Sequence, residues 1–158
     1  MKEIDRDTSI ELPSPRYTLV VTVDRQGKPN AMGLSYWTFT SHQPRMIAVC
    51  IKPDKYTHDC LEGCQEFVLC FPSEEQAKAA WLCGTKSGRT VDKFAEAGLV
   101  AIPAKVVRPP IISGSVAAYE CKVVGQMECG DHTLYNGEVV AVHGDPDRAE
   151  DRYTHYRK

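Results

Sequence analysis

The sequence contains no long hydrophobic run. No apolar stretch approaches the roughly 20 residues that a helix needs to cross a bilayer. Residues 1–7 are mostly charged and have no apolar core, so they do not form a secretory signal. The net charge is only −2, which gives no reason to expect a nucleic acid or an acidic membrane as a partner. We therefore expect a cytoplasmic protein that binds neither.

Several familiar catalytic and cofactor-binding motifs are also missing. The first predicted strand is not followed by Gly-x-Gly-x-x-Gly, and strands do not alternate with long helices, which excludes a doubly wound nucleotide-binding fold. The Gly-x-Ser-x-Gly elbow of serine hydrolases is absent. None of the five histidines has the His-Glu-x-x-His spacing of a metal site. The sequence therefore predicts no metal site and assigns no residue with certainty to catalysis.

The cysteines are numerous but do not form a recognised motif. There are seven, an odd number, which argues against a complete disulfide framework. In a reducing cytoplasm we expect the thiols to stay free. Cys60 and Cys64 are four residues apart on a predicted helix, so they share a face that we expect to pack on the core. Cys129 precedes His132 by three residues and could be an activated thiol. A thiol-based redox protein using Cys60, Cys64 or Cys129 is therefore one alternative.

The chain has the composition and length of one globular domain. Hydrophobic residues make up 42% and charged residues 25% of its 158 residues. Residues 1–16 are polar and end in a proline-rich segment, which predicts an arm. Residues 145–158 are highly charged and predict a tail. We expect the folded domain to occupy residues 17–144.

Strand patterns outnumber helix patterns. Apolar and β-branched runs predict six strands over residues 17–23, 29–40, 46–51, 66–71, 115–127 and 135–142, the first three forming a meander. One short helix is expected to begin at an N-cap, Thr57, and to end at Gly63. A capping box of Ser73 and Gln76 predicts the start of another, which ends near Gly84. Short helices and hairpin-scale connections favour a mainly β protein, a six-stranded antiparallel barrel that is closed or half-open.

The strand predicted over residues 29–40 has an unusual pattern. Small residues alternate with large ones, namely Ala31, Gly33 and Ser35 with Met32, Leu34 and Tyr36. A period of two places the small side chains on one face. Such a bare face would let a flat ligand approach the backbone closely. The alternative is that the small residues fit under a neighbouring sheet.

Three polar segments combine glycine, hydroxyl groups and cations. They are residues 52–58, 84–93 and 130–132. Backbone N–H groups, hydroxyls and positive charge at short range are what a phosphate needs, and Thr57 adds the favourable end of a helix dipole. The alternative is that these are turns with solvated ion pairs. Asp131 and His132 could form an acid/base pair, which makes His132 a candidate for a catalytic residue.

Ordered motifs along the chain resemble a known family. They are Asn30-Ala31-Met32, Ser35-Tyr36-Trp37, Pro44, Tyr56-Thr57-His58, Ser87-Gly88-Arg89, Asp92-Lys93-Phe94, Gly130-Asp131-His132 and Gly137-Glu138-Val139-Val140. In this order and spacing they resemble the flavin reductase-like family with an FMN-binding split barrel, and within it the flavoredoxin branch. The resemblance covers roughly residues 17–143.

The resemblance implies a six-stranded split barrel, a homodimer and one non-covalent FMN per subunit near the dimer interface. It implies an oxidoreductase that passes electrons from NAD(P)H or a reduced electron carrier to flavin, ferric iron or another acceptor. A flavin-binding module that stores or senses flavin without turnover is the alternative.

The resemblance also implies roles for particular residues. Those expected to line the isoalloxazine ring and ribityl chain are Asn30, Ala31, Met32, Gly33, Leu34, Ser35 and Trp37. Those expected near the phosphate end are Thr57 and Lys93, with Ser87 and Arg89 as further candidates. His132 would lie near the flavin from the last loop.

Overall fold

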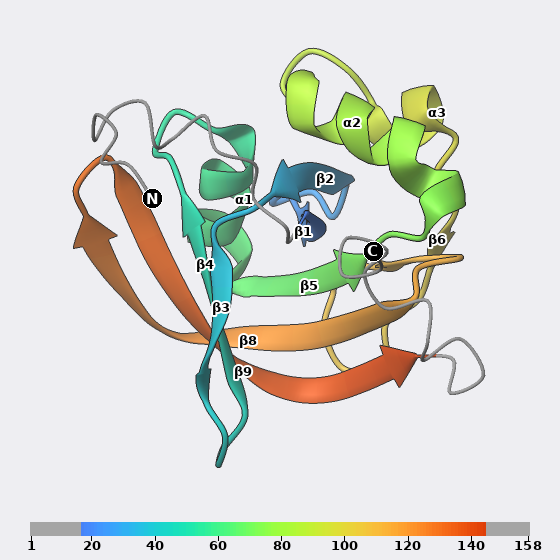
Figure 1. Ribbon diagram of the computed structural model, residues 1–158. Helices are drawn as coiled ribbons and strands as arrows, with labels where there is room; N and C mark the ends of the chain where they lie inside the picture. Colours follow the sequence, from blue (N-terminus) through green and yellow to red (C-terminus); the bar gives the residue numbers. More distant parts are fainter. Residues whose placement is uncertain (1–16, 145–158) are drawn as a thin grey trace, which may run out of the picture.

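The computed structural model describes residues 17–144, in which β-strands predominate (Figure 1). Seven strands form one curved antiparallel sheet in the order β2-β1-β5-β8-β9-β4-β3, and β6 and β7 form a separate two-stranded ribbon. The strands are β1 Thr18–Val23, β2 Pro29–Leu34, β3 Trp37–Ser41, β4 Met46–Ile51, β5 Glu66–Phe71, β6 Ala101–Ile102, β7 Ile111–Ile112, β8 Ala117–Cys129 and β9 His132–Gly144. The helices are α1 Tyr56–Cys64, the 3-10 helix η2 Glu74–Gln76, α2 Ala77–Thr85 and α3 Lys93–Ala97.

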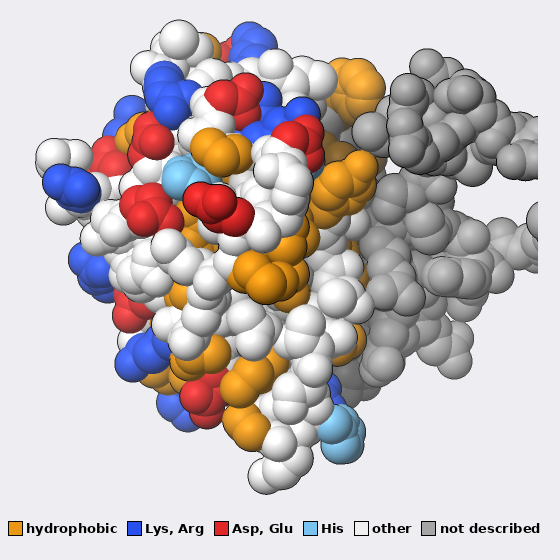
Figure 2. All heavy atoms as spheres, turned by 90° about the vertical axis from the view of Figure 1, so that its left-hand side faces the viewer, with side chains coloured by type: hydrophobic (Ala, Val, Ile, Leu, Met, Phe, Trp, Pro, Cys, Tyr) orange, Lys and Arg blue, Asp and Glu red, His pale blue; other side chains and the backbone are white. Residues whose placement is uncertain are grey.

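The predicted mainly β fold with short helices is confirmed, and the sheet curls into a half-open barrel (Figure 1). The predicted arm, residues 1–16, and tail, residues 145–158, lie outside the described part. None of the helices within residues 17–144 is long and apolar enough to cross a membrane. On the face drawn in Figure 2, described Lys, Arg, Asp and Glu side chains are intermingled, so this face has no extended charge of one sign.

The prediction of one strand over residues 29–40 was wrong. The segment forms β2, which pairs with β1, and β3, which pairs with β4 at the other end of the sheet order. The chain leaves one edge and reaches the other through Ser35 and Tyr36. There the Trp37 N–H donates to the Ser35 carbonyl at 3.2 Å, and the Tyr36 carbonyl accepts from the Cys50 N–H at 2.9 Å. The sheet therefore has seven strands and not six, and the predicted meander is divided between its two edges.

The helix boundaries agree with the sequence only in part. The capping box is present, with the Ser73 N–H donating to Gln76 Oε1 at 3.1 Å, and it opens η2, which leads into α2. Thr57, however, is not an N-cap, because α1 begins at Tyr56 with Lys55 as its N-cap. The helix also passes Gly63 and ends at Cys64.

All residues of β1 are buried, and an apolar cluster lies on each side of this strand. Leu19 and Val21 pack on the side of α2, α3 and β7, whereas Val20 packs with Leu61 of α1 within the curve of the sheet (Figure 1). Cys60 and Cys64 are buried on α1, as predicted for a helix face that packs on the core. All seven cysteines lie in the described residues, and their thiols are free.

A buried carboxylate fixes the loop between the two ribbon strands β6 and β7. Glu120 on β8 has no exposed surface and accepts backbone N–H groups from Lys105, Val106 and Val107 at 2.7, 2.7 and 3.1 Å. His143 Nε2 lies 2.6 Å from the same carboxylate. Burial alone would raise the pKa of Glu120, but these hydrogen bonds outweigh it and the pKa is lowered. The ionised carboxylate is therefore the form that holds the loop.

We expect Glu120→Gln to lower the free energy of unfolding at neutral pH by about 1–3 kcal/mol, because buried N–H groups lose their acceptor. Because the folded pKa is depressed, this stabilisation is present above the unfolded value, near 4.5, and is lost as the pH falls through the folded pKa. Urea unfolding at several pH values measures it. Glu128→Gln, an exposed site on the same strand, is the control. Equal stability of both variants would contradict the anchoring role.

Candidate functional site

A cavity of about 570 Å³ opens where β2, β4, α1 and the end of α2 meet. Its volume falls within the about 300–1,000 Å³ typical of small-molecule sites. The wall consists of residues 32–36, 50–52, 54–57 and 83–88 together with Lys93 and His132. The three polar segments predicted from the sequence and the small-residue strand therefore border one cavity.

The small-residue face of β2 is covered by protein. A Cβ placed on Gly33 would overlap the Tyr17 hydroxyl oxygen and lie 3.0 Å from the Gly84 Cα. The Tyr17 hydroxyl donates to the Ala80 carbonyl of α2 at 2.9 Å, and Ala31 is fully buried. The small residues thus allow a helix to pack closely, so the prediction of a bare face for a ligand was wrong. The alternative, a fit under a neighbouring sheet, is also wrong, because Tyr17 and the helix α2 are what pack on Gly33.

The open edge of β2, and not its face, offers main-chain groups to the cavity. β2 ends the sheet order, and within residues 17–144 it pairs only with β1. In an antiparallel pair, alternate residues direct their N–H and C=O groups toward or away from the partner strand. The Ala31 carbonyl accepts from Lys93 Nζ at 2.9 Å and so points away from β1. Gly33, two residues later and at the cavity wall, has the same orientation.

Lys93 places an ammonium group between β2 and α2. The residue is 4% exposed, and its Nζ donates to the Ala31 and Cys83 carbonyls at 2.9 and 2.8 Å. An ammonium has three N–H donors, and within residues 17–144 the third has no partner. Burial lowers the pKa of Lys93. An anion in the cavity would satisfy the third donor and favour the charged form.

The first turn of α1 carries a second set of donors. Thr57 is 1% exposed, and its Oγ1 accepts from Asn30 Nδ2 at 3.0 Å, so the hydroxyl proton remains available to a ligand. The backbone N–H groups of a first helical turn have no partner within the helix and lie at its positive end. Asn30 is 3% exposed, and among the described residues its Oδ1 has no partner. Both an anion and a hydroxyl group could be bound here.

The segment that follows α2, which contains Ser87 and Gly88, packs directly on the first turn of α1. A Cβ on Gly88 would overlap Asn30 Oδ1 and lie 2.6 Å from Tyr56 Cδ1, so glycine is needed for the close approach. Ser87 borders the cavity, and its Oγ accepts from the Arg89 N–H at 3.3 Å. The Ser87 hydroxyl can therefore donate its proton to a ligand.

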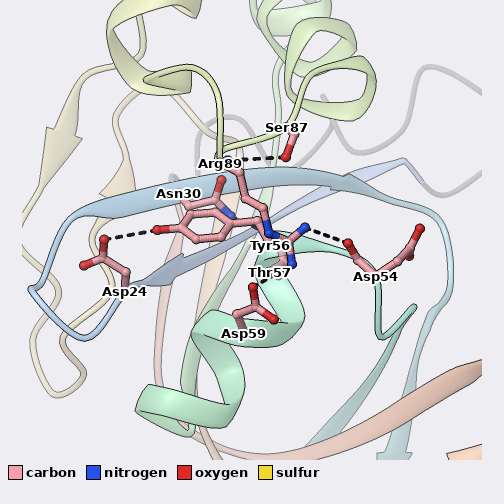
Figure 3. Close-up of polar contacts among 8 residues, drawn as sticks. All are labelled: Asp24, Asn30, Asp54, Tyr56, Thr57, Asp59, Ser87 and Arg89. Carbon is pink, nitrogen blue, oxygen red and sulfur yellow. Dashed lines mark hydrogen bonds and ion pairs between the residues drawn. The ribbon is translucent and has the colours of Figure 1, made fainter.

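Arg89 itself does not border the cavity. Its guanidinium lies over the Tyr56 ring, 5.8 Å from the centroid, and donates to the Asp54 carbonyl at 2.7 Å and to Asp59 Oδ2 at 2.6 Å (Figure 3). The side chain is thus turned toward α1. This arrangement does not support the predicted contact between Arg89 and a phosphate.

Trp37 also lies outside the cavity wall. Its ring packs edge-on against Phe71 and Phe39, with centroid distances of 5.1 and 5.8 Å. Of the predicted site residues, those that border the cavity are Met32, Gly33, Leu34, Ser35, Thr57, Ser87, Lys93 and His132, whereas Asn30, Ala31, Trp37 and Arg89 do not. Asn30 and Ala31 instead support Thr57 and Lys93 from behind.

His132 reaches the cavity from the β8–β9 hairpin. Gly130 has a φ of 60°, as a two-residue turn with glycine in its first central position requires. His132 Nδ1 lies 2.6 Å from Asp131 Oδ1, and Lys52 Nζ lies 2.9 Å from Asp131 Oδ2. Lys52 and then His132 lower the pKa of Asp131 to about 2. The Tyr36 ring is 5.2 Å from the His132 ring. Sequence reasoning missed Lys52 and Tyr36 as neighbours of His132, although both stand in the motifs that it singled out.

The Flavin reductase like domain family model matches residues 12–158 of this chain. A protein of Archaeoglobus fulgidus is 37% identical over 134 residues, which cover 84% of this chain and 74% of the relative. The NADH-dependent FAD reductase of Streptomyces globisporus is 31% identical over 127 residues, which cover 80% of this chain and 68% of the relative.

Solved structures give the same result. The flavoredoxin of Desulfovibrio vulgaris (Miyazaki F) superposes with a TM-score of 0.83 at 31% identity, covering 93% of this chain and 78% of that chain. An FMN-binding protein from Thermus thermophilus with bound 1-cyclohex-2-enone superposes with a TM-score of 0.82 at 25% identity, covering 94% of this chain and 80% of that chain. The predicted resemblance to flavin reductase-like proteins, with flavoredoxins among the neighbours, is confirmed, as is the split-barrel fold.

We expect Gly33→Ala to destabilise the fold by about 1–3 kcal/mol, because the added methyl group forces α2 and Tyr17 away from β2. The cavity should be disturbed as well, since α2 forms part of its wall. Thermal unfolding measures the loss of stability. Gly125→Ala is the matched control, because a Cβ there would meet no atom within 4 Å. Equal melting temperatures for the two variants would contradict the close contact.

Proposed function

The chain belongs to the flavin reductase-like family, and on that premise we propose that it binds one FMN in the cavity beside β2 and passes electrons from a reduced donor to an acceptor. The similarity to a flavoredoxin and to an FMN-binding protein supports FMN as the cofactor. When bound, the flavin ring would supply the electron-transfer chemistry, and the protein would supply binding, orientation and electrostatics.

The observation that carries the proposal is a set of donors beside the open edge of β2 that have no partner within residues 17–144. They are the Thr57 hydroxyl, the Tyr56 and Thr57 N–H groups at the start of α1 and the third N–H of Lys93, and they suit a phosphate. The His58 N–H is not among them, because it donates to the Lys55 carbonyl at 2.9 Å. Asn30 does not border the cavity and would act indirectly, by holding the Thr57 Oγ1 in place. The outward main-chain groups at Gly33 would meet the polar edge of the ring. The residues present therefore fit the group.

His132 would face the ring from the opposite wall. Asp131 and Lys52 occupy its Nδ1 side, so Nε2 is the nitrogen that can bind a ligand or hold a proton in the cavity. Its side chain is 17% exposed, which leaves it accessible from the cavity. The remaining wall residues bind and orient, and no other side chain of the wall is assigned a proton-transfer role.

We also propose a homodimer with the flavin near its interface, and NADH, NADPH or a reduced electron-carrier protein as the donor. The NADH-dependent FAD reductase among the relatives supports a nicotinamide donor. Large apolar side chains are exposed on β3, β8 and β9, with Phe39 46%, Met127 59% and Val142 55% exposed, which supports a buried interface there. A solution mass equal to that of one 17.6 kDa chain would contradict the dimer.

The alternative thiol-based function has little support. Burial raises the pKa of both Cys60 and Cys64, which disfavours the reactive thiolate. Flavin storage or sensing differs from the proposed function only in turnover, so a direct experiment must separate them.

We expect the protein to bind FMN. Under anaerobic conditions, the bound flavin should lose its visible absorbance when NADH, NADPH or reduced ferredoxin is added. The absorbance should return when ferric citrate is added, because the acceptor reoxidises the flavin. An anaerobic titration with NADH, NADPH and reduced ferredoxin measures both steps. Absence of FMN uptake would refute the proposed site, and uptake without reduction by any donor would favour storage or sensing.

We expect Thr57→Val to weaken FMN binding about tenfold, because a hydrogen bond to a charged group contributes about 1.5–3 kcal/mol. Thr57→Ser keeps the hydroxyl and should bind FMN like the unmodified protein. Quenching of flavin fluorescence gives both dissociation constants, and thermal unfolding shows whether the lost contact with Asn30 alters the fold. Equal affinity of the two variants would exclude the hydroxyl as a phosphate ligand.

A further inference from the structure

Arg89 connects two segments that form opposite sides of the cavity end where Thr57 lies. It belongs to the segment after α2, and its guanidinium donates to the Asp54 carbonyl before α1 and to the Asp59 carboxylate within α1 (Figure 3). The two nitrogen–oxygen distances are 2.7 and 2.6 Å. Both terminal nitrogens therefore donate to α1 or to the segment before it, and Arg89 itself is not among the residues that border the cavity.

The group beneath Arg89 is itself held in place. The Tyr56 ring lies 5.8 Å below the guanidinium, and the Tyr56 hydroxyl donates to Asp24 Oδ2 at 3.1 Å. Burial and then this hydrogen bond raise the pKa of Tyr56 to about 12. The ring thus forms a fixed surface on which the planar guanidinium can stack.

Backbone contacts next to Arg89 connect its guanidinium, which is bound to α1, with the residues that border the cavity. The Arg89 N–H donates to Ser87 Oγ at 3.3 Å, and the Ser87 carbonyl accepts from the Thr90 and Val91 N–H groups at 3.1 and 3.2 Å. Gly88, between Ser87 and Arg89, rests on Asn30 with no space for a Cβ. Fixing the guanidinium on α1 therefore also fixes Ser87 and Gly88 against the Asn30 and Thr57 pair.

We propose that Arg89 is a positioning residue of the phosphate subsite. It fastens Ser87 and Gly88 to the first turn of α1 and does not touch the phosphate itself. This inference rests on the proposed function, in which Thr57 and its neighbours bind the phosphate of FMN.

Removing the charge of Asp59 distinguishes a positioning role of Arg89 from direct binding of the phosphate by Arg89. Asp59 is in the first turn of α1, where its negative charge opposes an anion bound nearby. If Arg89 were a phosphate ligand, Asp59→Asn would release the guanidinium and remove the repulsion, and FMN would bind more tightly. If Arg89 fastens the segment, Asp59→Asn loosens the subsite, and we expect this loss to outweigh the removed repulsion, so that FMN binds more weakly. The two roles thus predict changes of opposite sign.

The experiment compares the affinities of the full chain for FMN and for riboflavin, which lacks the phosphate. The variants are Asp59→Asn and Arg89→Lys, which retains the positive charge but cannot make the forked contact. We expect both to weaken FMN binding about tenfold, corresponding to the loss of a charge-assisted contact, and to leave riboflavin affinity unchanged. Glu74→Gln and Lys122→Ala alter the charge at exposed sites elsewhere and serve as matched controls. Flavin fluorescence at constant ionic strength gives every dissociation constant.

Three results would overturn the inference. Tighter FMN binding by Asp59→Asn, together with unchanged binding by Arg89→Lys, would assign Arg89 to direct charge interaction with the phosphate. Equal weakening of FMN and riboflavin would show a general loss of structure. Unchanged FMN affinity in both variants would show that the attachment is not needed. Failure of the unmodified protein to bind FMN would instead refute the proposed function.

Discussion

At Gly33 and Gly84 the backbones of β2 and α2 approach so closely that neither residue has room for a side chain, because the Tyr17 hydroxyl fills the space beside them. This approach brings the end of α2 to the edge of the sheet. Lys93 can then reach carbonyl groups of both elements at once. The cavity wall formed by residues 83–88 exists because that helix ends there. Close packing of small residues thus creates the place for a ligand, to which Gly33 and Gly84 themselves contribute part of the wall.

The elements predicted correctly from the sequence are those set by local interactions. The capping box of Ser73 and Gln76 is complete within four residues, and the apolar runs of β1 and β5 are buried whatever their partners. The break at Ser35 and Tyr36 was missed because it depends on pairing with β1 and β4, which the alternating pattern does not encode. Pairing between distant strands is the part of a fold that periodicity leaves undetermined.

The site residues also divide into those that the sequence identifies and those whose contacts depend on the fold. Residue types predicted polar segments that suit an anion, the family resemblance singled out Thr57, Ser87 and Lys93 within them, and the fold gathers these three around one cavity. The resemblance implied the same role for Arg89, but its partner Asp59 is thirty residues away in sequence and holds the guanidinium on α1. A cation beside glycine predicts an affinity for negative charge. Only the fold decides whether a ligand or a carboxylate of the chain itself supplies that charge.

The open edge of β2 also bears on how the protein avoids aggregation by strand addition. An unpaired strand edge can template another chain and begin aggregation, and a lysine on the edge is one of the protections that natural sheets use. Lys93 provides this protection from a helix, by binding the outward carbonyl of Ala31. The same ammonium that would hold a ligand therefore also occupies an outward carbonyl that strand addition would require.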